Sequence, residues 1–429
     1  MLSSLVAARL ARQDIHYGWV IVAVTFFTAL VSSASVGVPS VFILPLQKEF
    51  GWSTTQVSSA LSIRLLLFGL MAPFAAALMV RFGVRSVVIV ALTINAGGLL
   101  ASLGMTQAWH LIALWGFVVG FATGMTAMVL GATVATRWFV ARRGLVIGIL
   151  AASTATGQLV FLPIMAQITE AYGWRIALGA MCAMLALAGL IVLLFMSDRP
   201  ADVGLRPFGD DGAAPAPTTP AAHSIVANAF RTLREAAGTR VFWVLFGTFF
   251  VCGASTNGLV QVHLIPMCAD FGIPATTSAG LLAAMGIFDF VGTIASGWLS
   301  DRYDNRWLLF WYYGLRGLSL MLLPFTDFSF YGLSLFAVFY GLDWIATVPP
   351  TVKLSAKHFG PERAALVFGW VFVGHQLGAA TAAFGAGLTR TVLDSYLPAF
   401  FAAGVLCLLA AAAIIVLMRQ TPAPAVATA

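Results

Sequence analysis

The chain has 429 residues, of which 60% are hydrophobic and only 9% are charged. Soluble domains carry about a quarter of their residues as charged side chains, so this composition excludes a fold whose whole surface faces water. The net charge of +7 is spread over the loops between apolar segments, and we therefore interpret it as a topology signal and predict no nucleic-acid partner.

Long apolar runs follow one another along the chain. A helix that crosses the hydrocarbon core needs about 20 mostly apolar residues, and no segment shows the ten-residue alternation of a membrane β-barrel. We therefore predict an all-α membrane protein with twelve transmembrane helices, at residues 18–44, 55–79, 86–105, 109–135, 144–168, 174–196, 241–267, 276–299, 307–325, 328–352, 365–389 and 396–418.

The basic residues between these runs are unevenly distributed. One side of the predicted membrane receives only Lys48, Arg175 and Arg390. Most of the others, with both termini, fall on the opposite side, which the positive-inside rule makes cytoplasmic. We expect a multi-pass protein of the cell membrane, in a bacterial inner membrane.

The two halves of the sequence match when one is offset from the other by 221 positions. Gly37, for example, then aligns with Gly258. Chance supplies Ala and Leu identities between apolar strings, but here Pro45, Arg81 and the pair Phe50-Gly51 also recur in the second half. Two six-helix pseudo-repeats are the plan of transporters whose halves rock about a central site. The predicted parts are a cytoplasmic N-terminus (1–17), a first bundle (18–196), a cytoplasmic linker (197–240), a second bundle (241–418) and a cytoplasmic tail (419–429).

The loop after the second run reads Ala76-Ala77-Leu78-Met79-Val80-Arg81-Phe82-Gly83-Val84-Arg85, and its repeat reads Gly297-Trp298-Leu299-Ser300-Asp301-Arg302-Tyr303-Asp304-Asn305-Arg306. Both resemble the G-x-L-x-D-R-x-G-x-R loop of the major facilitator superfamily, and the second copy keeps the acidic residue. The resemblance implies the major facilitator fold. It also implies a cytoplasmic gate whose charges cap helix ends, formed by Arg81, Arg85, Asp301, Arg302 and Arg306.

Two further motifs resemble the monocarboxylate transporter and oxalate–formate antiporter branch of that family. They are Asp14-Ile15-His16-Tyr17-Gly18-Trp19-Val20 and Arg137-Trp138-Phe139-Val140-Ala141-Arg142-Arg143-Gly144-Leu145-Val146-Ile147-Gly148. The resemblance implies a small organic anion as substrate. In the animal monocarboxylate carriers a first-span Lys follows a Pro, whereas here Ser40 follows Pro39. Their eighth-span Asp is followed four residues later by an Arg, whereas here Asp289 is followed by Thr293.

Ionisable groups within a membrane are costly and mark functional sites by default. The first bundle contains a single one, Arg64, and a planar guanidinium without a partner suits a substrate carboxylate. The alternative is that Arg64 pairs with Asp289 or Asp343 across the two halves.

The second bundle contains Asp289, Asp343, Arg316 and His375 at similar depth. For Arg316 an ion pair with Asp289 or Asp343 is favoured over substrate contact. We expect Asp343 to take part in proton coupling or substrate contact, and surplus acid or His375 to carry a coupling proton. His375 is also a predicted substrate-binding residue, and a packing role is the alternative. The remaining predicted substrate-binding residues, each of which has a helix-bonding alternative, are Asn257, Gln261 and Gln158.

The sequence therefore predicts a secondary active transporter of a small organic anion, a mono- or dicarboxylate, by alternating access with proton coupling or anion exchange. The alternative is an exporter of hydrophobic or cationic compounds, which would need an acidic residue in the first bundle's cavity. We found no nucleophile motif, metal cluster or phosphate loop, and so expect no enzyme activity, cofactor or metal. We expect the monomer to be functional, and we assign Cys182, Cys252, Cys268 and Cys407 to packing.

Overall fold

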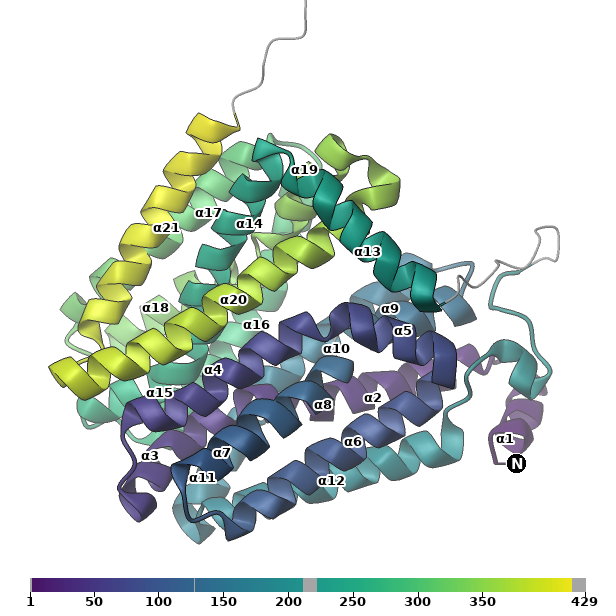
Figure 1. Ribbon diagram of the computed structural model, residues 1–429, viewed down its shortest axis with the longest axis horizontal. Coiled ribbons are helices and arrows are strands. Elements are labelled where there is room, and N and C mark those ends of the chain that lie inside the picture. Colours follow the sequence, from purple (N-terminus) through teal and green to yellow (C-terminus); the bar gives the residue numbers. More distant parts are fainter. Residues whose placement is uncertain (1, 127, 211–221, 419–429) are drawn as a thin grey trace, which may run out of the picture.

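The computed structural model describes residues 2–126, 128–210 and 222–418, and these residues fold into helices in two groups (Figure 1). The first group follows the N-terminal helix α1 (Leu2–Ala11). It contains α2 (Gly18–Gly37), α3 (Pro39–Phe50), α4 (Thr54–Leu70), α5 (Ala72–Phe82), α6 (Val84–Ala101), α7 (Ala108–Leu111), the π-helical turn η2 (Ile112–Val119), α8 (Gly120–Met125), α9 (Met128–Trp138), α10 (Arg143–Val160), α11 (Leu162–Tyr172) and α12 (Trp174–Phe195).

The second group begins after the linker helix α13 (Ala222–Ala237). It contains α14 (Arg240–Gly253), the π-helical turn η4 (Ala254–Val260), α15 (Gln261–Asp270), α16 (Ala275–Ser300), α17 (Asn305–Leu322), α18 (Phe330–Asp343), α19 (Val348–Phe359), α20 (Pro361–Leu393) and α21 (Leu397–Leu417). The short 3-10 turns η1 (Ser102–Gly104), η3 (Pro200–Val203) and η5 (Leu323–Thr326) lie in connections or at helix ends.

The predicted all-α membrane fold is confirmed. Within the described residues, ten helical stretches are long and apolar enough to cross a membrane, and the bent pair α4 and α5 makes an eleventh. The remaining predicted run, 144–168, coincides with α10 and α11, which are separated at Phe161. Several helices expose large apolar side chains on one face, as α16 does with Ile287, Phe290 and Ile294, and lipid is the solvent that suits such a face.

Several spans are interrupted near their middle, and proline follows the interruption. The second residue of the following helix is Pro73 in α5, Pro163 in α11 and Pro349 in α19. Proline lacks an N–H and fits the first turn of a helix, where that N–H would have no intrahelical partner. The interruption in the tenth span is the longest of these, since α18 ends at Asp343 and α19 begins only at Val348.

The two groups contact each other mainly in the part of the molecule remote from α13, which we call the remote end. There α4 packs along α20, α11 and α10 pack against α16, and α3 packs against α15 (Figure 1). Hydrogen bonds cross the boundary from Thr55 Oγ1 to Thr391 Oγ1 (2.8 Å) and from Ser62 Oγ to the Ala380 carbonyl (2.6 Å).

At the opposite end, which we call the linker end, α13 contacts both α5 of the first group and α20 of the second. The indole of Trp370 on α20 donates to the Ala229 carbonyl (2.9 Å). Arg363 on α20 forms an ion pair with Glu235 on α13 (2.8 Å).

Candidate functional site

The interruption of the tenth span leaves backbone groups without helical partners at the centre of the second group. A helix end loses its intrahelical hydrogen bonds, and each buried polar group left unsatisfied costs about 1–3 kcal/mol. In a membrane such irregular backbone is tolerated only where it is buried in protein or lines a cavity. The contacts of the turn Trp344–Thr347 therefore show what stabilises it.

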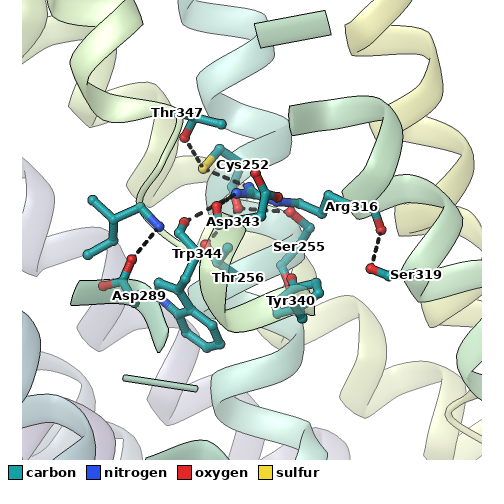
Figure 2. Close-up of polar contacts among 11 residues, drawn as sticks. Cys252, Ser255, Thr256, Asp289, Arg316, Ser319, Tyr340, Asp343, Trp344 and Thr347 are labelled. Atoms are coloured by element: carbon teal, nitrogen blue, oxygen red, sulfur yellow. Dashed lines mark hydrogen bonds and ion pairs between the residues drawn. The ribbon is translucent and has the colours of Figure 1, made fainter. Parts of the chain in front are cut away.

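Arg316 on α17 supplies the donors for this turn. Its Nη2 donates to the carbonyls of Asp343 (2.5 Å) and Trp344 (3.2 Å), and its Nε donates to the Asp343 carboxylate (2.6 Å). Its Nη1 lies 3.0 Å from the sulfur of Cys252 on α14. Figure 2 shows the guanidinium enclosed by these groups. The Asp343 carboxylate compensates its charge, and three of its four contacts bind it to the break.

The helix α16 supplies the other partners of the turn. The carboxylate of Asp289 accepts from the backbone N–H of Ile345 (2.8 Å), as Figure 2 shows. It also accepts from the hydroxyl of Thr293 (3.0 Å). The hydroxyl of Ser296 donates to the Ala346 carbonyl (2.5 Å). Side chains from the eighth and ninth spans thus replace the helical hydrogen bonds that the tenth span has given up.

A second irregular segment lies beside the break. The π-helical turn η4 follows Cys252, and the Tyr340 hydroxyl of α18 donates to the Ser255 carbonyl within it (2.7 Å). The Cys252 thiol and the Thr347 hydroxyl, from the two sides, are 3.3 Å apart. Isolated π-turns occur frequently at functional sites, and here each irregular segment contacts the helix that precedes the other.

The charges of this cluster do not balance. Arg316 is one guanidinium, while Asp289 and Asp343 are two carboxyl groups, and all three side chains are buried. The Oδ1 atom of Asp343 has no hydrogen-bond partner among the described residues. An uncompensated buried charge is expensive, and the cluster contains one more carboxyl group than its single guanidinium can compensate.

His375 lies on α20 close to this cluster. Its ring stacks on Phe372, with centroids 5.4 Å apart, and contacts Phe249 of α14. Its Nδ1 is buried and has no hydrogen-bond partner among the described residues. A Cβ placed on Gly253 would overlap the His375 carbonyl, so α14 and α20 approach each other here as closely as small residues allow.

Arg64 lies apart from the cluster, in the first group. It is 1% exposed, and its two terminal nitrogens donate to the carbonyls of Ser35 (2.8 Å) and Val36 (2.7 Å) at the end of α2. Its Nε has no partner among the described residues. Among the described residues Arg64 forms no ion pair with Asp289 or Asp343; Asp343 is bonded to Arg316, and Asp289 to Ile345 and Thr293.

The uncharged predicted residues lie on three helical segments. Asn257 is on η4, Gln261 begins α15 and is buried, and both have polar partners. Gln158 is on α10, but its side chain is outside the described part of the chain. Gln376 of α20 approaches Gly69 of α4 and is therefore at the boundary between the two groups.

The predicted gate residues make their contacts within their own groups. Arg85 donates to the Leu193 carbonyl near the end of α12 (2.5 Å), and its repeat counterpart Arg306 donates to the Met418 carbonyl after α21 (2.8 Å). A cation at a helix C-terminus is favourable, so each arginine stabilises the end of the last span of its group. Arg81 lies over the ring of Phe82.

The remaining gate residues surround the start of α17. Asp301 forms an ion pair with Lys353, whose ammonium group holds the pKa of this carboxyl below its usual range. Arg302 lies over the ring of Trp298, 3.9 Å from its centroid.

Sequence reasoning missed the polar contacts of Cys252, Ser296 and Tyr340. The sequence does contain a signal for the break itself, the pair Pro349-Pro350 inside an apolar run. In the described ranges no group of three or more His, Cys, Asp or Glu side chains lies together in a way that would hold a metal ion.

The profile of the Major Facilitator Superfamily matches residues 25–383 and 264–429. The chain belongs to the Major Facilitator Superfamily. Monocarboxylate transporter 13 of Rattus norvegicus is 27% identical over 418 residues, which cover 95% of this chain and 91% of that protein. An uncharacterized MFS-type transporter of Bacillus subtilis is 23% identical over 406 residues, covering 90% of this chain and 91% of the relative.

Solved transporters of this superfamily share the fold. A bacterial homologue of the lysosomal transporter Spinster superposes with a TM-score of 0.74 at 16% identity, covering 95% of this chain and 99% of that one. The xylose transporter XylE of E. coli gives 0.69 at 14% identity, covering 94% and 100%. The protein is therefore a multi-span membrane transporter and not an enzyme, and the resemblance to monocarboxylate transporters is confirmed.

Proposed function

We propose that this transporter carries a small organic anion, a mono- or dicarboxylate, by alternating access. The observation that carries the proposal is Arg64. It is a buried guanidinium whose hydrogen bonds go to neutral carbonyls and whose Nε is unpartnered, in a group of helices where no carboxylate of the described residues pairs with it. Carbonyl oxygens orient the guanidinium without neutralising its charge, so a substrate carboxylate is the natural counter-ion.

The relatives support the same substrate class. Those with assigned names include monocarboxylate transporters from rat and cattle, at 27% and 26% identity. The names of these relatives agree with the substrate class that the chemistry of Arg64 indicates.

The placement of contacts supports alternating access. The two groups are held together directly at the remote end, and at the linker end α13 contacts both of them. In this proposal the linker end is the open side in the present state, and the contacts between α4 and α20 separate when the remote end opens. The basic loops make the linker end cytoplasmic in this proposal, with the chain working as a monomer in a bacterial inner membrane.

Proton coupling belongs to the same proposal and involves Asp289 and Asp343. Two buried carboxyl groups beside one guanidinium favour a proton on one of them, and a change in their surroundings during transport would release it. His375, whose Nδ1 has no hydrogen-bond partner in the described part of the chain, is the second proposed proton carrier. Asn257, Gln261 and Gln158 complete the proposed substrate site.

The experiment compares Arg64→Gln, Arg64→Lys and the wild type in proteoliposomes loaded with radiolabelled mono- and dicarboxylates. Loss of charge-assisted hydrogen bonds of about 1.5–3 kcal/mol predicts that Arg64→Gln weakens carboxylate affinity by one to two orders of magnitude, with Arg64→Lys between the two. Arg85→Gln, which removes another arginine that bonds a helix carbonyl, is the matched control and should keep substrate affinity.

Folding of each variant is checked by gel filtration and thermal unfolding in detergent. A folded Arg64→Gln variant with wild-type affinity for carboxylates would contradict the anion site. Uptake of organic cations in place of carboxylates by the wild type would contradict the substrate class.

A further inference from the structure

A groove lies on the outer surface of the second group, between α14 and α21, which pack against each other. It is lined by α14 from Arg240 to Val251 and by α21 from Leu406 to Leu417, and its volume is about 370 Å³. Apart from Arg240 and Thr248, its lining side chains are apolar. In a membrane such a surface faces lipid.

The length of the groove corresponds to one leaflet. Arg240 is the first residue of α14 at the linker end, and Val251 is eleven residues further along the helix. At a rise of 1.5 Å per residue the groove extends about 16 Å from the end of the helix, which is about half of the 30 Å hydrocarbon core. An acyl chain of a phospholipid has this extent.

The head of the groove is cationic. Arg240 is exposed and has no hydrogen-bond or ion-pair partner among the described residues. The neighbouring indole of Trp243 already donates to the Ala237 carbonyl (2.8 Å), so Arg240 is the group available to a ligand. An unpaired arginine at the end of a span, at the level of the headgroups, attracts anionic lipids.

The floor of the groove is open because residue 247 is glycine. A Cβ added at Gly247 would meet no atom within 4 Å. In the sequence repeat Gly247 corresponds to Phe26, and Arg240 corresponds to Trp19. Phe26 packs against the core of the first group, and Trp19 packs on Phe139 with ring centroids 5.2 Å apart. The glycine and the arginine of the groove are therefore not repeated at the matching positions of the first group.

We propose that this groove is a binding site for one anionic phospholipid, with an acyl chain along α14 and α21 and the phosphate on Arg240. The site is separate from the proposed substrate site, which lies inside the helix groups. Its occupant stabilises the packing of the seventh span on the twelfth, since a ligand that binds only the folded state adds to its stability.

The experiment measures lipid retained by delipidated protein after incubation with phosphatidylglycerol or phosphatidylcholine, by native mass spectrometry. The wild type should retain one phosphatidylglycerol per chain and prefer it over phosphatidylcholine by about fivefold, the factor expected from one arginine near the membrane surface. Glycerol 3-phosphate, which has the same phosphate without chains, should not displace it.

Two variants test the recognition of the lipid headgroup and of the acyl chain separately. Arg240→Gln should abolish the preference for phosphatidylglycerol, while Arg9→Gln, an exposed arginine of α1, should keep it. Gly247→Leu should fill the groove and lower retention of both lipids. Gly189→Leu on α12 is the matched control, because that glycine also has open space around it.

Retention of phosphatidylglycerol by Gly247→Leu at the wild-type level would overturn the proposal. So would displacement of the lipid by glycerol 3-phosphate, or an equal loss of preference in Arg9→Gln. A wild-type dimer that Gly247→Leu converts to monomers would assign the groove to a second copy of the chain and would also overturn it.

Discussion

Arg64 and Arg316 both donate hydrogen bonds to backbone carbonyls at a helix end, but within the described part of the chain only the charge of Arg316 is compensated by a carboxylate. Each is 1% exposed and donates to backbone carbonyls where a span is interrupted, Arg64 at the end of α2 and Arg316 at the end of α18. Arg316 is also bonded to the Asp343 carboxylate, so its charge is compensated. The charge of Arg64 is not compensated by any carboxylate of the described residues, and that difference separates a structural arginine from a candidate anion site.

We expect Arg316→Met to destabilise the protein by about 3–5 kcal/mol, because it leaves the Asp343 carboxyl group buried without a partner. The double variant Arg316→Met with Asp343→Leu should recover much of this loss, since a buried ion pair is often replaceable by apolar side chains. Thermal unfolding in detergent measures both. Equal stability of the single variant and the wild type would show that the pair is not structural.

The sequence predicted the class of partner for Arg316 but not the arrangement around it. Opposite charges at similar depth in one bundle were enough to favour a pair with Asp289 or Asp343, and the structure selects Asp343. The contacts to Cys252 and to the Trp344 carbonyl were not predictable, because they depend on which face α14 and α18 turn toward α17. Helix rotation follows from packing of the whole bundle, which hydropathy along one chain does not contain.

At the scale of the element, the unwound turn Trp344–Thr347 owes its conformation to side chains of other spans. Prolines at positions 349 and 350 remove two N–H donors. Within the break, Asp289 accepts from the Ile345 N–H. Ser296 donates to the Ala346 carbonyl, and Arg316 donates to the Asp343 carbonyl. Hydropathy located the span itself, and the Pro-Pro pair indicates that it breaks. The sequence alone does not show that α16 supplies the bonds, since Ser296 resembles any other small residue of an apolar helix.

Ser296→Ala should destabilise the protein by about 1–3 kcal/mol, because the buried Ala346 carbonyl would lose its donor. The control is Ser319→Ala, since Ser319 donates to the Arg316 carbonyl within its own helix (2.8 Å) and that carbonyl keeps its helical environment. Urea or thermal unfolding of the two variants in the same detergent compares them. A larger effect at Ser319 than at Ser296 would contradict the assigned role of α16.

The start of α17 provides a prediction about pH. Asp304 caps this helix by accepting from the Arg306 N–H (2.9 Å), and its ion pair with Arg306 (2.6 Å) lowers the pKa of the Asp304 carboxyl. A depressed pKa means that the contribution to stability is complete above the unfolded value of about 3.9 and is lost as the pH falls through the lower folded value.

Asp304→Asn keeps a capping side chain but removes the charge. It should therefore lose the ion-pair contribution at neutral pH, less than about 1 kcal/mol for a pair this exposed, and should show no further loss from this site below about pH 4. Asp304→Ala should also remove the cap, at a cost of about 1 kcal/mol at any pH. Melting temperatures between pH 3 and pH 6 distinguish the three proteins. An unchanged acid slope in both variants would place the responsible carboxyl group elsewhere.

At the scale of the whole molecule, the repeat in the sequence predicted two groups of similar plan. The end-capping arginines Arg85 and Arg306 follow that plan, whereas the buried charges do not repeat. The arrangement of the two groups was not predictable, because in the proposed alternating-access cycle the same sequence adopts more than one arrangement of its halves. In this structure α4 and α20 are in contact at the remote end.

If the halves rock, a covalent link across the remote end should stop transport. Thr55 and Thr391 are hydrogen-bonded across the boundary between the groups (2.8 Å), and the four native cysteines are buried and unpaired. Cysteines introduced at both threonines and joined by a short bifunctional methanethiosulfonate should therefore abolish uptake in proteoliposomes, and a reducing agent should restore it. Substrate binding from the linker end should persist, because the link holds the present state.

The matched control places the same reagent within one group. Gln47 and Thr54 are also hydrogen-bonded (2.9 Å), but both belong to the first group, so cysteines linked at these positions should move together and leave transport largely intact. Wild-type uptake by the linked Thr55→Cys, Thr391→Cys protein would mean that the remote end does not open during transport. Substrate would then have to pass by a path that leaves the contact between α4 and α20 in place.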